Sequence, residues 1–252
     1  MRSFDDFVSA AAPATPLLPL LHVTDSLSLR LVLKDKALKP QRCTVFNENF
    51  LYFSYGRPAF RPNAGTEASA LSSYAPVCIL VDGGKIPLKK VFPFDSGAFH
   101  NGLFSKAMHR RMKLESFELA ASIDRPQKIV TTFFDTNVKY YDNETREMVG
   151  APATLFEVES FVALLRNKQQ EHYDDRVSSI ELVTSHAVFL KGNVLAIIFP
   201  IIFLEDAEFV KAVEVLNAEL LTYPLGARIG NEAIFGQISL LARDFFQRRG
   251  LL

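Results

Sequence analysis

The 252-residue chain has no tryptophan, only two cysteines and no net charge, and each shortage makes a class of protein improbable. Cys43 and Cys78 belong to no CxxC pair, so the sequence predicts a reduced protein without a structural zinc site. Lysine plus arginine equals aspartate plus glutamate, at 28 residues each. This balance argues against a broad nucleic-acid surface but is compatible with a local basic cleft.

Long apolar runs are also missing. The longest, residues 194–204, contains Pro200 and falls well short of the ~20 residues that a membrane-spanning helix needs. Asp5 and Asp6 stand where a secretion signal would carry positive charge, and prolines interrupt the apolar run that follows. We therefore expect a cytoplasmic protein that has no membrane partner.

Several catalytic motifs are absent from the sequence. It contains no GxGxxG, no Walker P-loop, no HExxH and no GxSxG. The five histidines are scattered, and no two of them have the helical spacing of metal ligands. A zinc hydrolase and a nucleotide-triphosphate motor are therefore disfavoured, and we expect no bound metal.

The residues that are present predict one large domain spanning 1–252, since 48% of them are hydrophobic. Strand and helix patterns alternate irregularly, which favours an α+β class with a largely antiparallel sheet. Residues 1–16 are expected to form an N-terminal arm. Residues 100–170 are a candidate for an inserted helical subdomain.

Local patterns place the main elements. Helices are predicted at 3–12, 27–34, 152–167, 208–216 and 231–248. In the third of these helices, Thr154 is the expected N-cap and Phe156 is expected on the buried side. Strands are predicted at 20–24, 50–55, 76–81, 86–94, 179–184, 194–199 and 219–223, with 76–81 and 86–94 paired across a Gly-Gly turn.

A basic cluster, His109-Arg110-Arg111-Met112-Lys113, is predicted to lie on a helix. Two interpretations stay open for this cluster and for the basic C-terminus. The charges form a solvated surface, or they contact nucleic acid locally.

The chain is organised around the stretch from Phe50 to Phe60, FLYFSYGRPAF. Its aromatic residues predict a strand, and Gly-Arg-Pro ends that strand with Arg57 at its mouth. One interpretation is a core strand followed by a turn. The other is a surface on which aromatic rings stack a planar group while the guanidinium pairs with a phosphate.

Two further patterns carry polar residues on predicted strands. His22 and Thr24 project to the same side of the strand at 20–24, because side chains alternate along a strand. Glu181 interrupts an apolar strand, with Arg176 upstream. A carboxylate in a strand either faces solvent or serves a functional cleft, because burying it without a partner is costly.

Taken in this order, the three patterns resemble the ADP-ribosyltransferase fold, and most of all the DarT-like enzymes that modify DNA. The matching residues lie in both ends of the chain and leave residues 61–170 unmatched. The resemblance implies a split mixed or antiparallel sheet with flanking helices. The chain departs from the family at the end of the first helix, where Lys36 replaces the favoured glycine.

The resemblance also implies roles for individual residues. NAD would be consumed as a substrate, and Glu181 and Arg57 would be the catalytic residues, with Arg57 on the diphosphate. Glu181 would bond the ribose hydroxyl and stabilise the oxocarbenium-like cation that forms when nicotinamide leaves. The remaining cofactor contacts would come from His22, Thr24, Tyr52, Tyr55 and Arg176.

Several alternatives remain open at this stage. Glu232, in the first turn of the last helix, is the rival carboxylate. Asn47 and Asp95 lie in loops near strand ends and are further candidates. The resemblance implies a macromolecular acceptor, DNA or protein, and a toxin or phage-defence setting, and the residues do not identify the acceptor. The competing functions are a non-catalytic nucleotide- or protein-binding module of the same fold and an NAD-using phosphotransferase.

Overall fold

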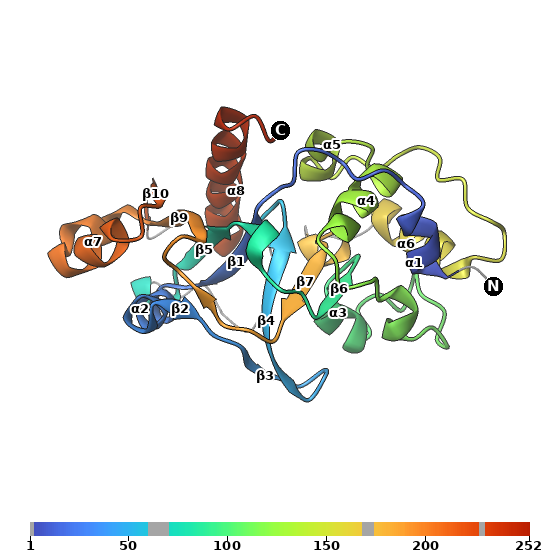
Figure 1. Ribbon diagram of the computed structural model, residues 1–252, viewed down its shortest axis with the longest axis horizontal. Coiled ribbons are helices and arrows are strands. Elements are labelled where there is room, and N and C mark those ends of the chain that lie inside the picture. The colour runs from blue at the N-terminus through green and yellow to red at the C-terminus, as the bar shows by residue number, and fades with distance from the viewer. Residues whose placement is uncertain (1–2, 60–70, 168–173, 227–229) are drawn as a thin grey trace.

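The computed structural model describes residues 3–59, 71–167, 174–226 and 230–252 and is built on one central sheet (Figure 1). The strands are β1 (Leu20–Asp25), β2 (Ala37–Leu38), β3 (Gln41–Cys43), β4 (Glu48–Tyr55), β5 (Pro76–Val81), β6 (Lys90–Phe92), β7 (Glu181–Thr184), β8 (Val188–Phe189), β9 (Val194–Pro200) and β10 (Glu219–Tyr223). The sheet has the order β10-β9-β5-β1-β4-β7-β6, with β3 paired to β4, and β2 pairs separately with β8. Only β9 and β10 are parallel among these pairs, so the predicted α+β class with a mostly antiparallel sheet is confirmed.

Helices cover both faces of this sheet. The α-helices are α1 (Phe4–Ser9), α2 (Ser26–Asp35), α3 (Ser96–His100), α4 (Asp124–Phe133), α5 (Asn137–Tyr141), α6 (Phe156–Arg166), α7 (Ala207–Glu214) and α8 (Asn231–Arg248). Short 3₁₀ turns are η1 (Ser72–Tyr74), η2 (Gly83–Lys85), η3 (Leu114–Phe117), η4 (Asp175–Val177) and η5 (Ile201–Glu205). Figure 1 shows α1, α4 and α6 gathered at one end of the molecule and α2 and α7 at the other.

Strand alternation divides the core between the two faces. Leu20 and Ile79 belong to the larger core, which also contains side chains of α1, α4 and α6. Their neighbours Leu21 and Leu80 point the other way and pack with Ile238 and the rest of the buried side of α8. Successive residues of a strand face opposite sides, so an apolar run such as 76–81 supplies both cores at once.

The sheet forks between β1 and β4. These two strands share only the pairs Leu20↔Tyr55 and Leu21↔Ser54, whereas β1 pairs with β5 along its whole length. Beyond Leu21 the strands diverge, and Figure 1 shows β1 running toward α2 while β4 runs down to β3. One arm of the fork is β10-β9-β5-β1, and the other is β4-β7-β6 with β3.

The N-terminal segment is part of the core rather than a detached arm. Phe4 of α1 is 1% exposed, and its ring lies 5.5 Å from that of Phe117 and 5.9 Å from that of Phe161. Phe133 of α4 stacks on it at 6.0 Å. The aromatic side chains of residues 100–170 therefore share one hydrophobic core with α1 and the sheet.

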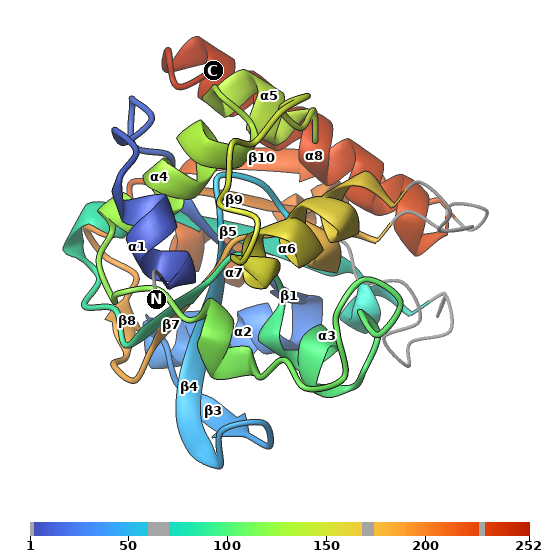
Figure 2. The same cartoon turned by 90° about the vertical axis from the view of Figure 1, so that its right-hand side faces the viewer.

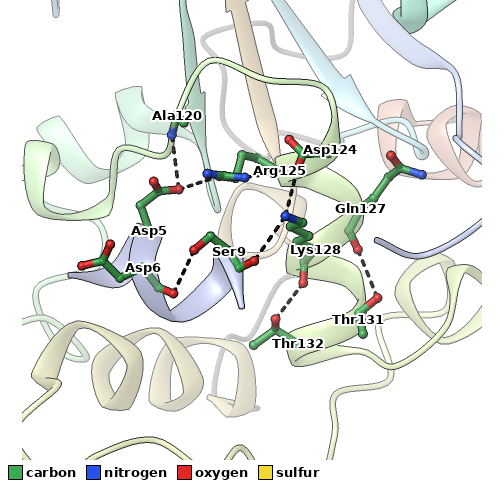
Figure 3. Close-up of polar contacts among 10 residues, drawn as sticks. All are labelled: Asp5, Asp6, Ser9, Ala120, Asp124, Arg125, Gln127, Lys128, Thr131 and Thr132. Atoms are coloured by element: carbon green, nitrogen blue, oxygen red, sulfur yellow. Dashed lines mark hydrogen bonds and ion pairs between the residues drawn. The ribbon is translucent and has the colours of Figure 1, made fainter. Parts of the chain in front are cut away.

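Polar contacts at the rim hold α1 against α4 (Figure 3). Arg125 Nε donates to Asp5 Oδ1 at 2.7 Å, and Lys128 Nζ donates to the Ser9 carbonyl at 3.2 Å. Arg125 and Lys128 also form ion pairs with Asp124 at 3.1 and 2.9 Å. Burial acts to raise the pKa of the Asp124 carboxyl, but hydrogen bonds with Ser122 and Lys128 and the two positive charges outweigh burial and lower it.

Several predicted elements are confirmed. Asp25 caps α2 by accepting from Ser28 N at 2.7 Å, and β10 and α8 have the predicted bounds. Lys36 ends α2 in the left-handed conformation, with φ at 56°, which is the backbone geometry that glycine adopts most easily. The helix therefore ends at Lys36 although the residue there is not glycine.

The predicted hairpin between 76–81 and 86–94 is wrong. β5 pairs with β1 and β9, whereas β6 pairs with β7. The segment after the Gly-Gly turn has Pro87 and Pro93 at its ends, which leaves only Lys90–Phe92 able to join a ladder. Tertiary packing, rather than closeness in sequence, selects the partners of both strands.

Two helix predictions also need correction. Thr154 does not cap α6, which begins at Phe156 without a side-chain cap, and Phe156 is 55% exposed. Residues 109–113 form turns and extended chain rather than a helix. The buried side of α6 is formed by Val158, Phe161 and Leu164, so the helix packs on the core without Phe156.

Candidate functional site

The candidate site lies at the fork, where His22 bridges the two arms. His22 Nδ1 lies 3.0 Å from the Tyr52 carbonyl oxygen, and its ring lies 5.9 Å from that of Phe53. A carbonyl oxygen only accepts hydrogen bonds, so Nδ1 carries a proton. The backbone pairing of β1 with β4 ends at Leu21, and the side chain of His22 then provides a hydrogen bond between the two strands.

Thr24 follows His22 on the same side of β1 and is half-buried. Its hydroxyl forms no hydrogen bond within the part of the chain that the structure describes. The strand hydrogen bonds of β1 go to β5, where Thr24 pairs with Val77. Thr24 thus offers a hydroxyl on the arm that carries His22, without a structural bond to hold it.

Tyr52 lies on the opposite arm, and its hydroxyl donates to Cys43 Sγ at 2.7 Å. Burial is the main cause that raises the pKa of Tyr52, followed by the bond to Cys43 and the negative charges of Glu181 and Asp95. The phenol is therefore a neutral hydrogen-bonding group at ordinary pH. Ser96 N donates to Glu181, and Asp95 is the residue before Ser96, so we treat Tyr52, Glu181 and Asp95 as one cluster.

Glu181 begins β7 and is 5% exposed. It pairs with Ser54 of β4 and Phe92 of β6, and its Oε1 accepts from Ser96 N at 3.4 Å. The sequence left open whether this residue faces solvent, and its burial decides the question. Tyr52 lies two residues before Ser54, so Tyr52 and Glu181 share one face of this arm.

Arg57 is held by the protein on most of its donor groups. Its Nη1 donates to the Tyr140 carbonyl at 2.8 Å, its Nη2 donates to Ser178 Oγ, and its guanidinium lies 4.7 Å from the centre of the Tyr140 ring. Asn143 Oδ1 lies farther away, at 3.4 and 3.5 Å. The buried Nε has no hydrogen-bond partner among the described residues.

Tyr55 lies wholly within the core. Its hydroxyl accepts from Leu18 N at 3.1 Å, and its carbonyl accepts from the Tyr140 hydroxyl at 2.7 Å. Burial raises the pKa of Tyr140 to about 12, and the side chain is fully buried. Tyr55 and Tyr140 therefore form a structural pair behind the fork, so the ring of Tyr55 does not face a ligand in this conformation.

Arg176 lies in η4, one turn before β7. Its guanidinium donates to both oxygens of Asp174, with Nε–Oδ1 at 2.8 Å and Nη2–Oδ2 at 2.5 Å. Its hydrogen bond to Asp174 is the main cause that raises its pKa, and the charge of Asp95 adds to it. The Arg176 carbonyl accepts from Asp95 N at 3.0 Å, which fixes the turn against the start of α3.

The structure brings some of the predicted residues together and separates others. Tyr52 and Glu181 share one face, Asp95 lies beside Glu181 through the bond from Ser96 N, and the Arg176 carbonyl accepts from Asp95 N. The ring of His22 contacts Phe53, which pairs with Leu182 of β7. Leu182 and Glu181 are successive strand residues and face opposite sides, so the ring of His22 lies on the side of the sheet that Glu181 does not face. Glu232 is exposed in the first turn of α8 and takes part in no described contact of this cluster.

Sequence reasoning missed several members of the site. Ser54 and Ser178 are buried polar residues on either side of Arg57, and Ser54 Oγ donates to the Arg57 carbonyl at 2.7 Å. A serine inside the aromatic strand was the available signal for Ser54. Nothing in the sequence pointed to Tyr140, which is 83 positions from Arg57 and reaches it only through the fold.

Two cavities border the described residues, and both lie away from this cluster. One, of about 430 Å³, is lined by Leu18, Asp82 and Arg249. The other, of about 660 Å³, lies between residues 106–116 and α6. In the described parts of the chain, no group of three or more His, Cys, Asp or Glu side chains is arranged to hold a metal ion, and no helix is long and apolar enough to cross a bilayer.

The sequence was compared with protein-family models and with curated proteins. No protein-family model matches the chain, and no curated protein matches it.

Proposed function

We propose that the chain is an NAD-dependent ADP-ribosyltransferase that modifies a macromolecular acceptor, either DNA or protein. One observation carries the proposal. The sheet forks between β1 and β4, with His22 and Thr24 on one arm and Tyr52 and Glu181 on the other. The two pairs face opposite sides of the sheet, so a bent dinucleotide that passes through the fork would meet both, and the resemblance in sequence leads to the same class.

In this proposal the reaction breaks the bond between the nicotinamide nitrogen and the anomeric carbon. Nicotinamide leaves as a neutral molecule with the bonding electron pair, and the ribose gains oxocarbenium character. Glu181 accepts a hydrogen bond from a ribose hydroxyl and stabilises that positive charge. The acceptor nucleophile then bonds to the anomeric carbon, and Glu181 takes its proton.

The other residues hold the substrate. Thr24 supplies a hydroxyl to the ribose or the amide, and His22 presents its ring beside it. Tyr52 offers a ring next to Glu181 and stays neutral because of its raised pKa. Arg176 stands beside the cluster but is engaged with Asp174, so a phosphate contact would have to compete with that ion pair.

Arg57 fits a supporting role better than direct contact with the diphosphate. It is 3% exposed, and its bonds to Ser178 and the Tyr140 carbonyl tie the turn before β7 to α5. Direct diphosphate contact requires this neighbourhood to open. In the closed arrangement, Arg57 instead fixes the position from which Glu181 projects.

A second candidate function is a non-catalytic nucleotide- or protein-binding module of the same fold. The burial of Arg57 and Tyr55 favours it, because two of the groups assigned to NAD are occupied by the protein itself. Such a module keeps the fork but releases no nicotinamide.

The test measures nicotinamide release and transfer of label from labelled NAD to mixed DNA and protein acceptors. We expect Glu181→Gln to lower turnover about 100-fold or more, since positioned acid–base groups contribute ~10²–10⁴-fold. Glu232→Gln is the matched control and is expected to retain activity. If the unaltered chain binds NAD without turnover, the result favours the binding module. If it neither binds nor consumes NAD, the proposal is overturned.

A further inference from the structure

The cavity of about 660 Å³ beside α6 has the features of a second binding site. In Figure 2, the green coil that follows α3 curls beneath the yellow helix α6. The cavity volume falls within the ~300–1,000 Å³ that small-ligand pockets occupy. Neither the candidate cluster at the fork nor the proposed reaction uses this part of the chain.

The two walls of this cavity carry opposite charges. Lys106 and Arg111 line it from the segment between α3 and η3, and Glu157 and Glu159 line it from the first turn of α6. None of these four side chains forms an ion pair within the described residues. The cavity therefore presents cations on one wall and carboxylates on the other, unpaired among the described residues.

Unpaired charge is not general among the basic groups that the sequence highlights. The C-terminal arginines 243, 248 and 249 all pair with carboxylates, at Asp142 and Glu219 among others. The basic side chains near the C-terminus are thus neutralised by carboxylates of the same chain, whereas Lys106 and Arg111 are not. The basic cluster keeps its charge available to a partner.

Apolar groups lie between the charged walls. Met108 is 7% exposed and Phe156 is 55% exposed, and Met112 and Ala163 complete this lining. Methionine side chains adapt to irregular partners, and an exposed aromatic at a cavity offers contact area at little entropic cost. Arg111 N donates to His109 Nδ1 at 3.2 Å, and His109 also lines the cavity.

We propose that this cavity binds a peptide segment in which apolar residues separate an acidic residue from a basic one. The acidic residue pairs with Lys106 and Arg111, the basic residue pairs with Glu157 and Glu159, and the apolar residues contact Phe156. Complementarity of both charge signs argues for a peptide. A nucleic-acid strand would place phosphates against the two glutamates, which repel them.

The experiment measures fluorescence anisotropy of labelled hexapeptides added to the full chain. We expect the peptide Gly-Asp-Leu-Leu-Lys-Gly to bind at least 10-fold more tightly than the neutral Gly-Asn-Leu-Leu-Gln-Gly. Lys106→Glu combined with Arg111→Glu is expected to remove this preference, and Phe156→Ala to weaken both peptides. The matched control changes Arg30 and Lys34 to Glu on the exposed side of α2, and binding should persist.

Each outcome bears on the proposal. Equal affinity for the two peptides, or a preference that survives the Lys106 and Arg111 changes, overturns it. Tighter binding of a single-stranded 20-nucleotide DNA that is lost in the same double variant overturns the peptide class. All altered side chains are at the surface, so unchanged melting temperatures show that the variants fold. The proposal does not depend on NAD turnover, and its failure leaves the proposed function untouched.

Discussion

The two arms of the forked sheet use different chemistry to hold equivalent strands. In the arm β10-β9-β5-β1, the residues of β5 are all buried and apolar, and beyond the backbone ladder the Pro76 carbonyl accepts from the Tyr223 hydroxyl at 2.5 Å. In the arm β4-β7-β6, the strands bury Ser54, Glu181 and Thr184, and Arg57 and Asp95 lie buried at their ends.

The difference indicates which arm has room for function. Apolar burial stabilises a strand whatever its exact neighbours, because the hydrophobic effect is not directional. Buried polar groups stabilise only when each finds a partner in the right place, so they fix geometry closely. The apolar strands of the first arm therefore supply most of the stability, with His22 and Thr24 of β1 at its edge, and the second arm supplies the buried polar groups.

The largest expected effect is a cavity in the apolar arm. Ile79 is fully buried at the centre of β5, and Ile79→Ala removes contacts with both neighbouring strands. We expect the free energy of unfolding to fall by about 3–4 kcal/mol, measured by urea denaturation. Leu31→Ala on α2, where the side chain is 53% exposed, is the control and should cost less than about 1 kcal/mol. A loss no greater than this control would show that the arm is not the main source of stability.

A smaller loss is expected from the polar arm. Arg57→Leu leaves the buried Ser178 hydroxyl without its bond from Arg57 and leaves the Tyr140 carbonyl with backbone donors alone, Asn143 N at 3.1 Å among them. We expect a loss of about 2–3 kcal/mol in the same denaturation experiment, since unsatisfied buried groups cost ~1–3 kcal/mol. Arg42→Leu on the exposed β3 is the matched control. Stabilisation by Arg57→Leu would mean that the polar bonds are dispensable and that the two arms do not differ as described.

The junction of the two arms gives a third test. Gly56 follows β4 with φ at 63°, and a side chain there would lie 3.0 Å from Leu18 Cβ and overlap the end of that side chain. We expect Gly56→Ala to cost about 2 kcal/mol. Gly192 has φ at 80° with open space around it, so Gly192→Ala carries the backbone penalty alone and is expected to cost about 1 kcal/mol. Equal losses would show that contact with Leu18 does not restrict the junction.

Much of the fold was predictable from the sequence because local signals agree with the tertiary structure. Asp25 before an amphipathic run marks the start of α2, and the branched runs at 194–199 and 219–223 form strands as predicted. The pairing of β6 with β7 was not predictable. A short strand after a Gly-Gly turn looks like half of a hairpin, and only the assembled sheet shows that β5 already has two partners.

The candidate site was predictable only in part. Glu181 and Tyr52 stood out as polar and aromatic groups on strands, and the fold places both in one cluster. The burial of Arg57 could not be foreseen, because its ring partner Tyr140 is remote in sequence. The strand register also places the ring of His22 and the side chain of Glu181 on opposite faces of the sheet. A register depends on which strands pair, so it cannot be predicted from the sequence of one strand alone.

The smallest expected effect comes from polar contacts at the surface, where α1 meets α4. Asp124 is 35% exposed, and its lowered pKa lies below the unfolded value of about 3.9. Its charge therefore stabilises the fold above that pH, and the contribution disappears as the pH falls through the lowered pKa.

Asp124→Asn should accordingly lower the free energy of unfolding by about 0.5 kcal/mol at pH 7, and this loss should shrink as the pH is lowered, measured by urea denaturation over a series of pH values. The control Asp244→Asn removes a more exposed carboxylate from its pair with Arg248 and should change stability even less. A loss at pH 7 as large as that of Arg57→Leu would remove the distinction between buried and exposed polar contacts. In that case the charge of a polar group, rather than its burial, would determine how much its hydrogen bonds contribute to the stability of the polar arm.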